Sequence, residues 1–94
     1  MIINRSIGDT SPVKVLWTGE VDFTDVTAIT LTVYSDQDKQ TQVETLTGEM
    51  RGFDPATYFP IIDANWTGVR WWTITITRGV EVKPLPTVYK WEQA

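Results

Sequence analysis

The chain has 94 residues, a formal net charge of −4, no cysteine and no histidine. With fifteen Thr, ten Val and eight Ile against only four Ala and four Leu, its composition favours strands over helices. The missing residue types exclude disulfides, thiolate chemistry and histidine-based catalysis or metal binding. The acidic balance argues against nucleic acid as a partner, and the short apolar runs argue against a membrane. We therefore expect an all-β protein that is not an enzyme and holds no cofactor or metal.

The first half of the chain predicts an arm and three strands. Residues 1–11 end in a turn-forming cluster, so we expect an N-terminal arm followed by a single domain over residues 12–94. Residues 13–18 and 27–34 alternate apolar and polar side chains, as half-buried strands do. A polar turn at 35–39 leads into a weaker strand at 40–47, which predicts a β-hairpin.

The second half predicts shorter strands around one long one. An Asp-Pro pair favours a single helical turn over 54–57, and Pro60 makes 58–62 an edge strand or a bulge. Residues 69–78 form a second clear strand. A return strand starts at 80–82, is interrupted by prolines, and is followed by a last strand at 87–92. About seven short strands with turns between them are typical of a sandwich or a small barrel.

Aromatic residues are the most informative feature for function, because five Trp are many for this length. Trp17 and Trp72 have inward parity on their strands, as Trp91 has. Trp71 shares its face with threonines that should point away from the core, and Trp66 falls in a predicted loop. Exposed Trp and Tyr are typical of protein interfaces, and they also stack on sugars. The alternative is that Trp71 covers a sheet edge or is turned inward by a bulge. The candidate interface residues are Trp66, Trp71 and Tyr34, together with Ile2, Ile3 and Ile7 of the arm.

Two segments carry a resemblance to a phage family. Gly8-Asp9-Thr10 precedes an apolar strand, and the run 21–34 (VDFTDVTAITLTVY) is similar to Ig-like domains at the N-terminus of phage baseplate upper proteins and related virion accessory proteins. Phe23 and Asp25 stand where Leu and Gly are usual in that family. The resemblance implies an immunoglobulin-like β-sandwich of about seven short antiparallel strands, and it brings no catalytic residues.

The resemblance also implies a role in a virion. Together with the aromatic excess and the arm, it favours a capsid decoration protein that binds the shell as a homo-oligomer, with the major capsid protein or a tail protein as partner. A small tail, neck or baseplate adaptor is the alternative, and a carbohydrate-binding module is a further one. The N-terminus lacks the apolar stretch of a signal peptide, so we expect assembly in the host cytoplasm.

Overall fold

The structure is a computed structural model that describes residues 2–17, 25–50, 56–85 and 87–94. Within these ranges every regular element is a strand and none is a helix, so the predicted all-β class is confirmed. Residues 21–24, the first four of the run that carries the phage resemblance, lie outside the described residues, and so do Asp54 and Pro55 of the predicted helical turn. Ala56 and Thr57 of that turn instead begin a strand. No described helix has the length and apolar character to cross a membrane.

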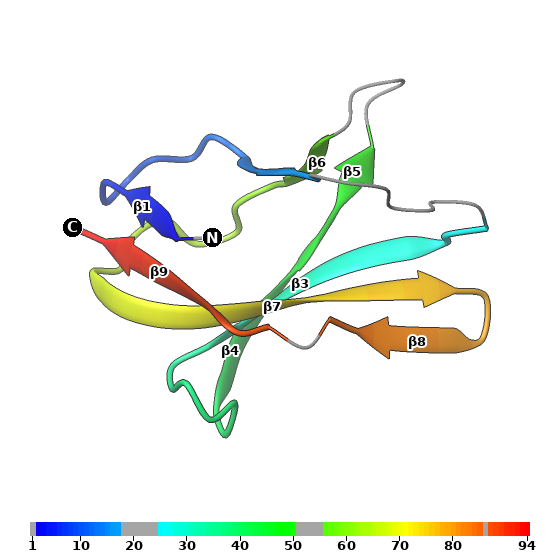
Figure 1. Ribbon diagram of the computed structural model, residues 1–94. Helices are drawn as coiled ribbons and strands as arrows, with labels where there is room; N and C mark the ends of the chain where they lie inside the picture. The colour runs from blue at the N-terminus through cyan, green and yellow to red at the C-terminus, as the bar shows by residue number, and fades with distance from the viewer. Residues whose placement is uncertain (1, 18–24, 51–55, 86) are drawn as a thin grey trace.

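The strands form two sheets (Figure 1). The larger sheet has the order β1 (Ile3–Arg5), β9 (Tyr89–Gln93), β7 (Gly68–Arg78), β3 (Ala28–Tyr34) and β4 (Gln42–Thr47), with β8 (Glu81–Pro84) also paired with β7. The smaller sheet has the order β2 (Val13–Leu16), β6 (Ala56–Phe59) and β5 (Glu49–Met50). β8 and β9 pair with successive parts of the same edge of β7. Of the two prolines predicted to interrupt the return strand, Pro84 is the last residue of β8, and Pro86 lies outside the described residues.

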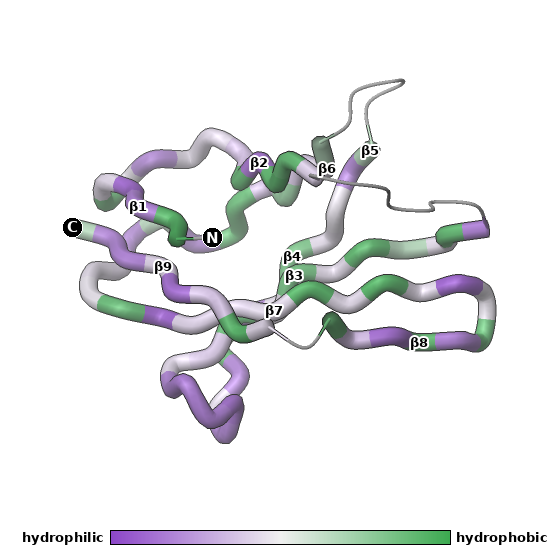
Figure 2. Tube along the Cα trace, in the orientation of Figure 1, coloured by the Kyte–Doolittle hydropathy of each residue, from purple (hydrophilic) through white to green (hydrophobic). Residues whose placement is uncertain are grey.

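One hydrophobic core takes side chains from both sheets. Alternation decides which ones, because successive side chains of a strand point to opposite faces. Figure 2 shows this alternation along β3 and β7, and it shows the hydrophilic hairpin that joins β3 to β4. The buried core residues are Val13, Val15, Ile29, Leu31, Val33, Leu46, Phe59, Trp66, Trp72, Ile74, Ile76 and Trp91. The inward parity predicted for Trp72 and Trp91 is confirmed, and Trp17 packs against this cluster as a partly buried residue.

The chain crosses between the sheets at Gly48. β4 ends in the larger sheet at Thr47, and β5 starts in the smaller sheet at Glu49. The Gly48 N–H donates a hydrogen bond of 2.7 Å to the carbonyl of Ile29. A Cβ at this position would lie 2.6 Å from Cγ2 of Thr57, so the crossing needs a residue without a side chain.

The N-terminal segment differs from the expected arm. Ile3–Arg5 forms β1, which pairs in parallel with β9, so the larger sheet is mixed rather than wholly antiparallel. The Ile7 N–H donates to the Ala94 carbonyl at 2.8 Å, and the Ala94 N–H donates to the Arg5 carbonyl at 3.1 Å. The two ends of the described chain are therefore hydrogen-bonded to each other. Sequence alternation missed β1 because three residues are too few to show a period.

Candidate functional site

The outer face of the larger sheet, the side away from the core, carries a grid of threonines. Cross-strand pairing aligns Thr45, Thr32 and Thr73 in one row across β4, β3 and β7. It aligns Thr47, Thr30 and Thr75 in the next row. Short β-branched side chains suit a pleated surface and leave it low in relief. This face is the one that the sequence singled out.

A row with two aromatic residues at its centre lies beside the threonine grid. The row runs across four strands and consists of Gln42 on β4, Tyr34 on β3, Trp71 on β7 and Lys90 on β9. Tyr34 and Trp71 are both half-buried, and they lie directly opposite each other. The pairing therefore brings together the two aromatic residues that the sequence predicted to share an outward face.

The same face carries very little charge. In the described strands, only Lys90 and Glu92 bring charge to it, and their Nζ and Oε1 atoms lie 2.6 Å apart. Exposed Val69 lies opposite Glu92 in the register. The charged residues of β7 have the opposite parity from Trp71 and belong to the inner side. The outer face thus combines two half-buried aromatics, threonines and a single ion pair.

The predicted exposure of Trp66 is wrong. Only 7% of it is exposed, because its ring packs edge-on against Trp91 with centroids 5.5 Å apart and the Arg70 guanidinium covers it at 4.1 Å. Gln93 holds the loop in place: its Nε2 donates hydrogen bonds of 2.9 Å to the carbonyls of Ala64 and Trp66. Trp66 is therefore a core residue that presents very little surface to a partner.

The three isoleucines of the predicted arm differ in how far they are exposed. Ile3 lies opposite Trp91 in the register and packs against the core as a partly buried residue. Ile2 and Ile7 are exposed, Ile2 by 63%. Ile2 and Asn4 flank Ile3 in the sequence, so strand alternation puts both on the outer side of β1. Of the six predicted residues, all but Trp66 keep accessible surface, Ile2 and Ile7 as exposed side chains and Ile3, Tyr34 and Trp71 as half-buried ones.

A buried ion pair lies at the inner side of the same strands. Glu44 on β4 has a side chain that is only 9% exposed, and its Oε1 lies 4.0 Å from an Arg70 nitrogen. Burial raises the pKa of Glu44, and the charge of Asp63 acts in the same direction, whereas Arg70 lowers the pKa. The environment therefore disfavours the carboxylate despite its cationic neighbour. Sequence reasoning missed this pair because Glu44 and Arg70 lie far apart along the chain.

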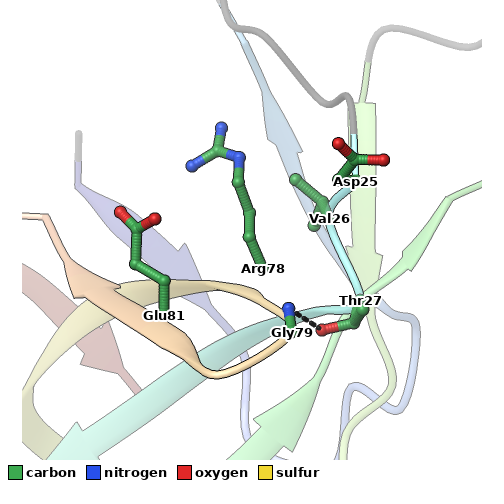
Figure 3. A pocket seen from close by; sticks show the side chains of 6 residues that line it. All are labelled: Asp25, Val26, Thr27, Arg78, Gly79 and Glu81. Atoms are coloured by element: carbon green, nitrogen blue, oxygen red, sulfur yellow. Dashed lines mark hydrogen bonds between the residues drawn. The ribbon is translucent and has the colours of Figure 1, made fainter.

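An open hollow of about 560 Å³ lies at the β7–β8 hairpin. Figure 3 shows its side chains, with Arg78 between Asp25 and Glu81 in this view. The Gly79 N–H donates to Thr27 Oγ1 at 3.3 Å and joins the hairpin to the start of β3. The hollow offers carboxylates and one guanidinium but no histidine, cysteine or serine among its lining residues. In the described ranges, no group of three or more His, Cys, Asp or Glu side chains is placed to hold a metal ion.

Comparisons with protein-family models, with curated proteins and with solved structures give no match. The outer face of the larger sheet combines accessible aromatic side chains with little charge, as the centres of protein interfaces do.

Proposed function

We propose that this chain is a non-enzymatic structural protein of a virion that binds its partner through the outer face of the larger sheet. The observation that carries the proposal is the placement of Tyr34 directly opposite Trp71 on an exposed, almost uncharged face. Half-buried aromatics in such a setting give large contact area at little cost in side-chain entropy.

We further propose that the fold is an immunoglobulin-like β-sandwich. In variable-type immunoglobulin domains, strand C′ joins the sheet formed by G, F and C, while B, E and D belong to the other sheet. Here the order β9-β7-β3-β4 corresponds to G-F-C-C′, and β2-β6-β5 corresponds to B-E-D. The correspondence supports the resemblance to Ig-like domains of phage accessory proteins, although β1 and β5 raise the strand number above the expected seven.

Capsid decoration is the favoured form of this role, with a tail, neck or baseplate adaptor as the alternative. A low-relief face without net charge suits a broad, shallow contact with a shell. Repetition of that contact over many equivalent positions gives avidity even where each contact is weak.

Co-sedimentation with purified virions tests the proposal. We expect Trp71→Ala and Tyr34→Ala each to weaken binding by about tenfold or more, as truncation of a central aromatic does. Tyr58→Ala is the matched control, because Tyr58 is a half-buried tyrosine on β6 of the other sheet. Binding that survives both outer-face substitutions contradicts the proposal. Glycan binding that depends on Trp71, without virion binding, replaces it with the carbohydrate-binding alternative.

A further inference from the structure

The charges on the outer face of the larger sheet are self-complementary. Lys90 and Glu92 are separated by one residue on β9 and therefore point to the same side. Their side chains are 38% and 46% exposed, so both remain accessible while paired with each other. In an interface with two-fold symmetry, residue i of one copy contacts residue j of the other, and j contacts i. Two β9 strands that cross face to face in opposite directions would bring each Lys90 to Glu92 of the other copy.

The distribution of charge over the molecule favours contact at this face. Each copy carries a net charge of −4, so two copies repel each other in most orientations. On the outer face the described strands carry one positive and one negative side chain, which cancel. Two copies can therefore approach through this face without bringing like charges together.

The apolar side chains occupy the centre of the same area. Trp71 lies opposite Lys90 in the register, and Val69 lies opposite Glu92. An aromatic centre beside polar and charged groups is the usual anatomy of a stable interface. The contact would thus bury Trp71 and Val69 of β7 beside a cluster of four alternating charges on the two β9 strands.

We infer that a second copy of this chain covers the outer face of the larger sheet, related by a two-fold axis that pairs Lys90 of each copy with Glu92 of the other. The inference rests on the proposed function, which makes this face the interaction surface, and it adds a second copy of the chain as an occupant of that face. The second copy and the virion surface would then compete for Trp71.

Charge reversal on the full chain tests the pairing. In sedimentation equilibrium we expect K90E and E92K each to weaken dimerisation by about tenfold or more, because each brings four like charges together. The double variant K90E/E92K restores both the internal and the intermolecular pairs, so we expect its dissociation constant to return to near the wild-type value. K14E makes the same charge change on β2 of the other sheet and should leave the constant unchanged. Far-UV circular dichroism of every variant checks that the fold is intact.

The outcomes separate this inference from the proposed function. A chain that stays monomeric at high concentration overturns the inference, and a dimer that responds equally to K14E and K90E does so too. A monomer that still sediments with virions through Trp71 overturns the dimer but keeps the proposed function. A dimer restored by the double reversal that binds no virion supports the inference and contradicts the proposed function.

Discussion

At the scale of single residues, Gln93 explains why a loop tryptophan is in the core. Its side chain is buried, and both of its amide hydrogens are used by carbonyls of the loop that carries Trp66. Without these hydrogen bonds, the Trp66 carbonyl would lose the Gln93 donor, and the Ala64 carbonyl would keep the Gly8 N–H, which donates to it at 2.8 Å. An unsatisfied buried polar group costs about 1–3 kcal/mol.

We expect Gln93→Ala to lower the free energy of unfolding by about 2 kcal/mol, because it removes two buried hydrogen bonds and leaves the Trp66 carbonyl without the Gln93 donor. Urea denaturation followed by tryptophan fluorescence measures the loss. Gln42→Ala is the control, since Gln42 is exposed and bonds only to Thr45 within its own strand among the described contacts. Equal losses in the two variants would show that Gln93 does not hold the loop.

Glu44 gives the stability a characteristic pH dependence. Burial raises its pKa above the usual value near 4.5. The folded protein therefore binds this proton more tightly than the unfolded chain. The contribution to stability is fully present below the unfolded pKa and is lost as the pH rises through the folded pKa. Asp36 acts in the opposite direction, because backbone N–H groups of Gln40 and Thr41 lower its pKa below the usual value near 3.8.

We expect Glu44→Gln to remove the fall in stability that the wild type shows as the pH rises above Glu44's usual value near 4.5. At pH 7 the variant should be as stable as the wild type or more so, since the amide avoids the cost of burying a charge. Denaturation curves across this range provide the test. Asp36→Asn should leave the slope of stability against pH in this range unchanged, and it should remove a loss of stability that the wild type shows only at more acidic pH. A marked loss of stability at pH 7 in Glu44→Gln would mean that its attraction to Arg70 outweighs burial.

At the scale of elements, Gly48 allows one continuous segment of chain to contribute a strand to each sheet. Its missing side chain lets the backbone pass within contact of Thr57, Phe59 and the Ile29 carbonyl. The larger sheet thereby receives β4 and the smaller sheet receives β5 without a long connection. Close packing leaves no room for an added methyl group.

We expect Gly48→Ala to destabilise the protein by about 1–3 kcal/mol through overpacking. Thermal and urea unfolding measure the effect. Thr57→Ser removes the methyl group nearest to the new Cβ and keeps the hydroxyl that accepts from Trp17 Nε1, so it should recover part of the loss in the double variant. Thr47→Ala, an exposed neighbour, is the control. Full stability in Gly48→Ala would contradict the tight crossing.

At the scale of the whole molecule, the N-terminal strand β1 forms an edge of the larger sheet by pairing with the C-terminal strand β9. β1 contributes Ile3 to the core opposite Trp91, and backbone hydrogen bonds tie Arg5 and Ile7 to Ala94. The segment that resembled a free arm is thus part of the domain.

We expect Ile3→Ala to lower the free energy of unfolding by about 1–2 kcal/mol, because it removes partly buried apolar surface. Ile2→Ala changes a neighbouring side chain that is 63% exposed and should stay within about 0.5 kcal/mol of the wild type. Urea denaturation of the two variants measures the difference. If both are neutral, β1 does not contribute to the stability of the domain.

The sequence by itself determined which side chains of a strand face the core, because this depends only on the alternation of apolar and polar residues along that strand. The alternation along β3 and β7 assigned Ile29, Leu31 and Val33, like Trp72, to the core. The same alternation placed Tyr34 and Trp71 on the outer face, because a side chain's face in a strand follows from its position alone.

Only the tertiary structure decided which distant segments meet. Trp66 is buried because Gln93, 27 residues further along the chain, binds its loop, and no local pattern signals such a contact. The parallel pairing of β1 with β9 likewise joins the two ends of the chain, and a glycine at 48 reveals a sheet crossing only when its neighbours are known. Alternation acts between adjacent residues, whereas burial of loops and choice of strand partners depend on side chains that folding alone brings together.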